Sequence, residues 1–276
     1  MINIGIDPVA FTIGAISIHW YGIFIALAIV WLVAWMAWQS KRGARISYDT
    51  VFAAALVGIP SGVIISRLLH VIDLWDHYVQ NPGEIIGAGG LTAYGAVLGA
   101  SLGIWVYCRI AKVKIGYFFD LLAPAVIVAQ AVIGRIGCTL NGCCFGDSCS
   151  LPWAITYTDP TSLGFGVGAV HPTQVYEIIF GLICFVVLVK LKGRFKPAGS
   201  LYLIYLGLYS MWRIGIDFLR PGTSFIFGLH QAQVIGIIVL LIVVPVLVYR
   251  TRWISTKEQL TQEEEQLAQE QEESNG

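Results

Sequence analysis

The chain has 276 residues, of which 57% are hydrophobic and only 12% charged, and its 17 basic and 17 acidic residues give a formal net charge of zero. Soluble domains carry roughly 25% charged residues, so the composition excludes an ordinary soluble enzyme, and we expect no nucleic-acid partner. Apolar runs of about the 20 residues that cross a bilayer recur along the chain. They are continuous, unlike the alternating segments of a β-barrel, and they predict an all-α polytopic membrane protein.

Seven apolar stretches are long enough to be transmembrane helices. Polar segments separate them, and a segment rich in Glu and Gln follows the last one. This pattern predicts a transmembrane domain over residues 1–252 and a solvated, acidic tail over residues 253–276. The predicted spans are residues 18–38, 50–71, 88–108, 117–136, 172–189, 199–217 and 230–249.

The basic residues are distributed unevenly over the loops between these spans. Thirteen of the 17 lie in alternate loops or after the last span, whereas residues 72–87 and 137–171 contain no Lys or Arg. Cytoplasmic loops are enriched in Lys and Arg. The asymmetry predicts an outer N-terminus and a cytoplasmic C-terminus. Residues 138–170, which are rich in Gly and Pro, are expected to form a small outer head instead of a further span.

Four arginines lie outside the cytoplasmic loops. Arg67, Arg135 and Arg213 fall within or at the outer ends of spans, and Arg220 lies just past the sixth span. A charge at the centre of a transmembrane helix costs about 2.5–3.5 kcal/mol, so these residues need a partner or a polar cavity. Snorkelling to the headgroups is the alternative. Snorkelling is most plausible for Arg220, which can be solvated at the interface.

The segment "RIGIDFLR" places Arg213, Asp217 and Arg220 at positions i, i+4 and i+7, on one helix face. Asp217 can pair with either arginine, which leaves a net positive face. With Arg135 and Arg67, this face suits an anionic group at headgroup depth, because guanidinium groups bind phosphate in bidentate fashion. An anionic phospholipid is the predicted ligand. A secondary transporter for an anionic solute is the main alternative, although no internal repeat is evident.

Other polar residues lie near the outer ends of spans. Tyr21 opens the first span, where anchoring in the aromatic belt is the simplest interpretation. Gln174 and Glu177, in "HPTQVYE", share one face of the fifth span, and Glu177 is expected to have a basic or hydroxyl partner. The glycines of "GAGGLTAYGAVLGA" are typical of close helix packing. Tyr94, among them, is the one hydroxyl of interest there.

Four of the six cysteines cluster after the fourth span, as Cys138, Cys143, Cys144 and Cys149. Zinc, a disulfide and free thiols all remain open. The spacing lacks the C-x2-C pair that is typical of zinc sites, so free thiols are the favoured interpretation. We expect neither a metal nor another cofactor.

Six segments, in the same order, make this sequence resemble the prolipoprotein diacylglyceryl transferase family over residues 1 to about 252. They are "DPVAFTIGAISIHWYG", "SRLLHVI", "GGLTAYGAVLGA", "GRIGCTLNGCCFG", "HPTQVYE" and "RIGIDFLR".

The resemblance implies a bacterial plasma-membrane enzyme of lipoprotein biosynthesis. It implies that the diacylglyceryl group of phosphatidylglycerol is transferred to the lipobox cysteine of an exported prolipoprotein. A thioether forms and glycerol-1-phosphate leaves. A paralogue that binds phosphatidylglycerol without transferring it is a further alternative.

Matching positions imply the site residues. Those implied to be catalytic are Arg135, Arg213, Tyr94 and Asp217, and those implied to bind phosphatidylglycerol are Arg135, Asn141, Arg213, Arg220, Tyr21, His171, Gln174 and Glu177.

Three positions depart from the family pattern. Many members have histidine at Tyr94, asparagine at Cys138 and an acidic residue at Cys143. Because tyrosine, with a reference pKa near 10, is a poor base at neutral pH, Tyr94 is expected to orient the substrate or donate a hydrogen bond. The general base is therefore unassigned.

Overall fold

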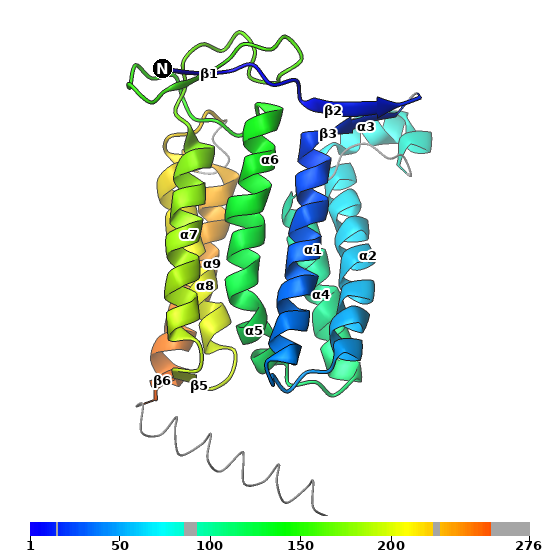
Figure 1. Cartoon of the computed structure of the whole chain (residues 1–276), viewed down its shortest axis with the longest axis vertical. Coiled ribbons are helices and arrows are strands. Elements are labelled where there is room, and N and C mark those ends of the chain that lie inside the picture. The colour runs from blue at the N-terminus through cyan, green and yellow to red at the C-terminus, as the bar shows by residue number, and fades with distance from the viewer. Residues whose placement is uncertain (15, 86–92, 223–226, 255–276) are drawn as a thin grey trace, which may run out of the picture. The chain divides into compact units, whose positions relative to one another are not determined.

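The computed structural model describes residues 1–14, 16–85, 93–222 and 227–254, and these residues are mostly helical (Figure 1). The chain forms two compact units: Met1–Leu32 together with Phe119–Gly276, and Val33–Phe118. The first helix runs from one unit into the other. In chain order, the elements before the fourth span are β1 (Ile2–Ile4), β2 (Val9–Ile13), β3 (Ile16–His19), α1 (Trp20–Lys41), α2 (Tyr48–Asp73), α3 (Trp75–Gln80), η1 (Pro82–Glu84) and α4 (Ala93–Ile110).

The remaining elements all belong to the first unit, apart from the start of one helix. They are α5 (Ile115–Val128), η2 (Ala129–Ile133), α6 (Gly134–Asn141), β4 (Ile155–Tyr157), α7 (Thr173–Leu191), β5 (Phe195–Lys196), α8 (Ser200–Asp217), α9 (Gln231–Arg250) and β6 (Arg252–Trp253).

Five helices among the described residues are long and apolar enough to cross a membrane. They are α1, α2, α7, α9 and the continuous helix Ile115–Asn141, which comprises α5, η2 and α6. This confirms a polytopic helical membrane protein. The third and sixth predicted spans coincide with α4 and α8, and the described apolar part of α4, Gly95–Ile110, is shorter than the others.

Small residues bring α2 and α4 close together in the second unit. A Cβ atom added at Gly99 would clash with the backbone carbonyl of Ser61, and one added at Gly62 would lie 3.0 Å from the carbonyl oxygen of Ala96. Side chains larger than hydrogen would therefore force the two helices apart. The prediction that glycines of the third span serve close helix packing is confirmed at Gly99.

In the first unit, α5, η2, α7 and α8 enclose a core of buried apolar side chains. Gly181 of α7 lies against Ala131 of η2, so these two segments approach closely. The five residues of η2 form a π-helical turn, which often occurs at functional sites. This turn directly precedes Arg135. The fully or nearly fully buried residues of the core are Ala123, Ile127, Ala131, Cys184, Leu188, Leu201 and Tyr205.

Between Asn141 and Thr173 the chain forms turns and the short strand β4. Gly142, with a φ of +68°, ends α6 in the left-handed conformation that glycine adopts readily. The strand β4 pairs in parallel with β1, which attaches the start of the chain to this segment. The sequence predicts a fourth span that ends near residue 136. The helix continues for about one more turn and ends at Asn141.

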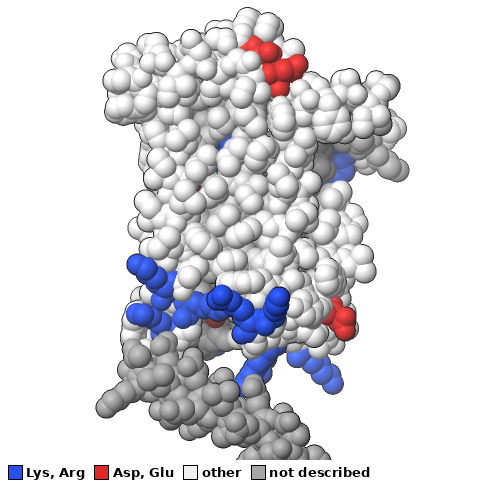
Figure 2. All heavy atoms as spheres, in the orientation of Figure 1, with Lys and Arg blue, Asp and Glu red and all other residues white. Residues whose placement is uncertain are grey.

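Within each unit, basic side chains gather near the ends of helices (Figure 2). In the first unit, β5 follows α7 and pairs with β6, which follows α9, so Lys196 and Arg252 lie opposite each other. In the second unit, the backbone N–H of Arg45 donates to the hydroxyl of Tyr117 at 3.1 Å, which joins the loop after α1 to the start of α5.

Candidate functional site

Glu177 lies at the centre of a buried ion-pair network. Its side chain is fully buried near the start of α7. One carboxylate oxygen lies 3.0 Å from Nε of Arg135 in α6 and the other lies 3.5 Å from Nη2 of Arg220, which follows α8. The hydroxyl of Tyr209 also donates to Glu177, at 3.3 Å. Glu177 therefore has both basic and hydroxyl partners, as expected. These three partners, Arg135, Arg220 and Tyr209, come from three different segments.

Asp217, the last residue of α8, forms a second buried ion pair. Its Oδ1 lies 3.0 Å from Nη2 of Arg213, one helical turn earlier, and its Oδ2 lies 3.1 Å from Nδ1 of His230. The predicted ambiguity of Asp217 is thus resolved in favour of Arg213. Arg220 does not share this face, because α8 ends at Asp217 and the i+7 spacing no longer applies.

We call Arg135, Arg213, Arg220, Glu177 and Asp217 the arginine cluster. Its three guanidinium groups and two carboxylates leave one positive charge. Burial lowers the pKa of Arg220, and the positive charges of Arg135 and Arg213 lower it further, so the three arginines share one electrostatic environment. Only 9% of the Arg220 side chain is exposed. The interpretation of Arg220 as a solvated residue is therefore wrong. The sequence does not reveal its partner, Glu177, because the two residues lie 43 positions apart along the chain.

The cluster contains a buried donor without an acceptor. Nε of Arg220 is buried and makes no hydrogen bond to any of the described residues. A buried donor without an acceptor costs about 1–3 kcal/mol, and such a group calls for an explanation. An anionic ligand that enters the cluster would supply the acceptor and would also balance the excess positive charge.

Gln174 and His171, two residues predicted to bind the lipid, make hydrogen-bond contacts within the protein. The amide nitrogen of Gln174, which is fully buried, donates to the carbonyl oxygen of Cys143 at 2.7 Å and to the hydroxyl of Tyr157 at 3.2 Å. Nδ1 of His171 lies 3.4 Å from the hydroxyl of Tyr176. Gln174 thereby positions the loop after α6, a role that the sequence does not indicate.

Tyr21 and Asn141 lie at the ends of helices that meet. Tyr21 is in the first turn of α1, and the position of a Cβ atom on Gly137 would be 3.5 Å from its Cα. Asn141 is the last residue of α6. The structure therefore places Arg135 and Asn141 on the same helix, α6, and brings Tyr21 next to that helix.

Arg67 and Tyr94 belong to the second unit. Nε of Arg67 donates to the carbonyl oxygen of Ile85 at 2.9 Å, and its guanidinium group lies 5.2 Å from the ring centre of Tyr78. These contacts stabilise the segment after α3. Tyr94 is the second residue of α4, but its side chain lies outside what the structure describes.

Sequence reasoning missed Tyr209 and His230. Tyr209 precedes Arg213 by four residues in α8, a helical spacing that could have indicated a shared face. His230 is the N-cap of α9, and its backbone N–H donates to the side chain of Gln233 at 2.9 Å. Its contact with Asp217 joins segments that no local pattern connects.

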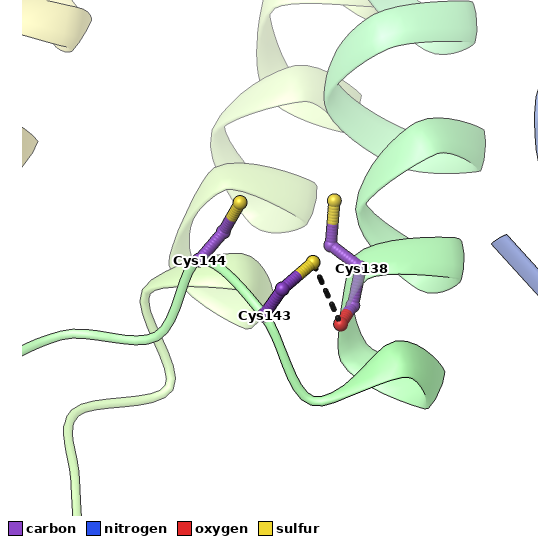
Figure 3. Close-up of side chains that lie close together, drawn as sticks. All are labelled: Cys138, Cys143 and Cys144. Atoms are coloured by element: carbon purple, nitrogen blue, oxygen red, sulfur yellow. Dashed lines mark hydrogen bonds between the residues drawn. The ribbon is translucent and has the colours of Figure 1, made fainter. Parts of the chain in front are cut away.

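Three thiols meet beside Arg135. The Sγ atoms of Cys138, Cys143 and Cys144 lie within 4.8 Å of one another (Figure 3). Nη1 of Arg135 donates to Sγ of Cys138 at 3.7 Å. Hydrogen bonds from the Cys138 and Cys143 thiols lower the pKa of Cys144, and the charges of Arg135 and Arg220 lower it further. Cys149 does not belong to this group. Three soft ligands at this separation can hold a metal ion.

Comparison with known proteins identifies the family. The family model described as prolipoprotein diacylglyceryl transferase matches residues 8–249. A protein of Dehalococcoides mccartyi named phosphatidylglycerol–prolipoprotein diacylglyceryl transferase is 47% identical over 253 residues, which cover 91% of this chain and 96% of that protein. Proteins of the same name from Clostridioides difficile and Pediococcus pentosaceus are 34% and 31% identical, over 84% and 90% of this chain and 90% and 91% of their own lengths.

Proposed function

Because the chain belongs to the prolipoprotein diacylglyceryl transferase family, we propose that it transfers the diacylglyceryl group of phosphatidylglycerol to the lipobox cysteine of prolipoproteins. The reaction forms a thioether and releases glycerol-1-phosphate. It is a step of lipoprotein biosynthesis. Its long apolar helices, which are of a length and composition that can cross a bilayer, support a reaction with a membrane lipid.

The single observation that carries this proposal within the structure is the arginine cluster. It holds one excess positive charge, and the buried Nε of Arg220 has no acceptor among the described residues. The phosphodiester of phosphatidylglycerol carries one negative charge and offers oxygen acceptors. Arg135, Arg213 and Arg220 would bind it, because guanidinium groups match phosphate geometry. Asp217 and Glu177 would orient these arginines.

The chemistry requires stabilisation of a leaving phosphate. The acceptor sulfur attacks the glycerol carbon that carries the phosphate, and the C–O bond breaks with its electron pair on the leaving oxygen. Negative charge on that phosphate group increases in the transition state. Arg135 and Arg213, with side chains only 14% and 15% exposed, would stabilise it in a poorly hydrated environment. Tyr94, Tyr21, Asn141 and His171 are proposed to contact the lipid or the acceptor.

The proposed arrangement in the membrane has seven spans, with α4 and α8 added to the five long apolar helices. We propose a bacterial plasma-membrane location with the N-terminus outside and the C-terminus in the cytoplasm. The enrichment of Lys and Arg in alternate loops, and the pairing of Lys196 with Arg252 within one unit, support this orientation. Residues 138–170 would then be an outer head, where exported prolipoproteins emerge, within a transferase domain of residues 1–252. Residues 253–276 would form a cytoplasmic tail.

A reconstituted reaction tests the function directly. Purified protein, phosphatidylglycerol vesicles and a lipobox peptide should yield a peptide whose mass has increased by one diacylglyceryl group, together with released glycerol phosphate. The matched control is the same peptide with serine at the lipobox cysteine, which should remain unmodified. Binding of phosphatidylglycerol without transfer would indicate the non-catalytic paralogue. Uptake of an anionic solute into proteoliposomes without lipidation would indicate the transporter.

A further inference from the structure

The three thiols beside Arg135 come from two adjoining segments. Cys138 lies in the last turns of α6, and Cys143 and Cys144 lie in the loop that follows. Figure 3 shows the three sulfur atoms directed toward a common region. Cys138 is buried, Cys143 is half-buried and Cys144 is exposed. The group is therefore anchored in the protein on one side and accessible on the other.

Hydrogen bonds that do not involve the thiols hold this loop in place. The hydroxyl of Thr173 donates to the carbonyl oxygen of Cys144 at 2.7 Å, and Gln174 donates to that of Cys143 at the same distance. The backbone N–H of Cys143 donates to the carbonyl oxygen of Cys138 at 3.1 Å. The first turn of α7 thus positions the two loop cysteines before any ligand binds.

Cys144 adopts a backbone conformation that non-glycine residues rarely use. Its φ of +63° lies in the left-handed region. Residues held in such conformations cluster at functional sites, where the surrounding structure enforces them. Here the hydroxyl of Thr173 donates to the carbonyl oxygen of Cys144, and Sγ of Cys144 lies within 4.8 Å of the other two sulfur atoms.

We propose that Cys138, Cys143 and Cys144 bind Zn²⁺ as three thiolates and that the fourth coordination position receives the acceptor thiol of the prolipoprotein. The second part of this proposal rests on the proposed function. The first part does not, because it concerns only the metal and this chain.

The geometry suits zinc. Four-coordinate zinc with Zn–S bonds of about 2.3 Å separates its sulfur ligands by about 3.8 Å. The three Sγ atoms, within 4.8 Å of one another, reach that separation through small side-chain rotations. Within the described part of the chain, no fourth His, Cys, Asp or Glu joins the group. Three protein ligands with one open position are typical of catalytic zinc sites.

The charges are also compatible. Three thiolates and Zn²⁺ carry one net negative charge, and the guanidinium group of Arg135 lies 3.7 Å from Sγ of Cys138. Arg135 is also a proposed phosphate ligand. A thiol bound at the open position would therefore lie close to the arginine that binds the leaving group, and the two reacting molecules would be brought together.

Zinc would solve the problem of activating the acceptor. A free thiol has a reference pKa near 8.5 and is mostly protonated at neutral pH, whereas a thiol that coordinates zinc is deprotonated. The proton passes to solvent when the sulfur binds. The bound thiolate then attacks the glycerol carbon, and the C–O bond breaks with its electron pair on the phosphate oxygen. The thioether that forms is a weaker ligand and leaves the metal.

This site departs from the expectation that the chain needs no metal. The spacing of the cysteines argues against zinc, because it lacks a C-x2-C pair. In the folded protein that spacing is not needed, because the end of α6 and the loop that hydrogen-bonds to α7 bring Cys138 next to Cys143 and Cys144.

Metal content tests the site without any turnover. Full-length protein purified in detergent without chelator is loaded with Zn²⁺, dialysed and analysed for zinc by mass spectrometry. We expect stoichiometric zinc in the wild type and its loss in Cys138→Ser and Cys144→Ser. Cys149→Ser is the matched control and should retain the metal. Because buried Cys138 can affect folding, the exposed Cys144 is the decisive variant.

Cobalt reports on the open position. Co²⁺ bound to the three thiolates should show thiolate-to-metal charge-transfer absorption and the visible bands of tetrahedral coordination. A lipobox peptide, added without lipid, should increase the charge-transfer absorption, whereas the peptide with serine at the lipobox cysteine should not. Equal spectra with both peptides would overturn the acceptor role.

The failure of this inference can be distinguished from failure of the proposed function. A protein that lipidates the peptide but contains no zinc, or in which two of the three cysteines are joined by a disulfide, overturns the metal site and leaves the transferase intact. A protein that binds zinc but does not lipidate the peptide overturns the transferase. Cys144→Ser that lipidates at the wild-type rate would also contradict the acceptor role.

Discussion

Arg135 contacts both the buried carboxylate of the arginine cluster and the group of three thiols. Its Nε lies 3.0 Å from Glu177, and its Nη1 lies 3.7 Å from Sγ of Cys138. Removing one preorganised donor from a developing charge typically lowers the rate about 10²- to 10³-fold. We expect Arg135→Ala to lower kcat for lipidation by at least that order. Arg135→Lys should restore only part of the rate, because lysine keeps the charge but loses the planar donor arrangement.

Thermal unfolding in detergent, measured beside the lipidation assay, separates a catalytic defect in Arg135→Ala from a folding defect. Near-normal lipidation by the folded variant would contradict the proposed role of Arg135. The phosphate would then have to bind at Arg213 or Arg220.

Arg220 is buried, although the sequence suggests that it can be solvated. We therefore expect its removal to have a larger effect than a solvated position would imply. Its side chain is buried, it pairs with Glu177 at 3.5 Å, and its Nε has no acceptor among the described residues. We expect Arg220→Ala to weaken binding of phosphatidylglycerol, measured as a raised KM, and to lower kcat. Arg109→Ala, in the last turn of α4, is the control and should leave both values unchanged. A wild-type KM for Arg220→Ala would contradict the assignment.

Glu177 should matter for stability as well as for orientation. Glu177→Gln would leave two buried guanidinium groups without their counter-charge, and breaking a buried ion pair typically costs about 3–5 kcal/mol. We expect a marked fall in the Tm in detergent. Glu84→Gln is a matched control, because Glu84 and its partner His77 are 63% and 53% exposed, and exposed pairs contribute little. Equal Tm values for the two variants would show that the network around Glu177 does not stabilise the fold.

At the scale of elements, the packing of α2 against α4 depends on the absence of side chains. A Cβ atom at Gly99 would clash with the backbone of Ser61, so Gly99→Ala must separate the helices. Overpacking of this kind costs about 1–3 kcal/mol, and we expect a lower Tm. Gly22→Ala in α1 is the control, because an added Cβ there meets nothing within 4 Å. An unchanged Tm for Gly99→Ala would mean that the two helices can move apart freely.

The continuous helix Ile115–Asn141 and α7 together build most of the site. The helix supplies Arg135 and Cys138, and α7 supplies Glu177 and, in its first turn, the donors that hold the loop of Cys143 and Cys144. The close approach of Gly181 to Ala131 fixes the spacing between these two segments. Small residues one helical turn from Arg135 and Glu177 therefore help determine where the ionic groups meet.

At the scale of the whole molecule, the distribution of basic residues leads to a testable topology. With seven spans and an outer N-terminus, the C-terminus lies in the cytoplasm. A C-terminal green fluorescent protein should fluoresce, and alkaline phosphatase at the same position should be inactive. Alkaline phosphatase inserted after Asn81, in the predicted outer loop of residues 72–87, should be active. An active C-terminal phosphatase fusion would contradict the seven-span arrangement.

The sequence by itself determined the class of protein, the positions of the main helices and the local side-chain pairs. Long apolar runs predict helices because a backbone in lipid must satisfy its own hydrogen bonds. The pair Arg213–Asp217 could be predicted for a similar reason, since helical periodicity places residues i and i+4 together. The resemblance of six ordered segments identified the family, which the family match over residues 8–249 confirms.

Only the tertiary structure decided which distant groups meet. Glu177 pairs with residues 42 positions before it and 43 after it, and Asp217 pairs with His230 across the end of α8. It also decided that three cysteines form one group while Cys149 does not. Local periodicity describes neighbours along one helix, but the partners of a buried charge are set by how helices pack, and that depends on side-chain volumes distributed over the whole chain.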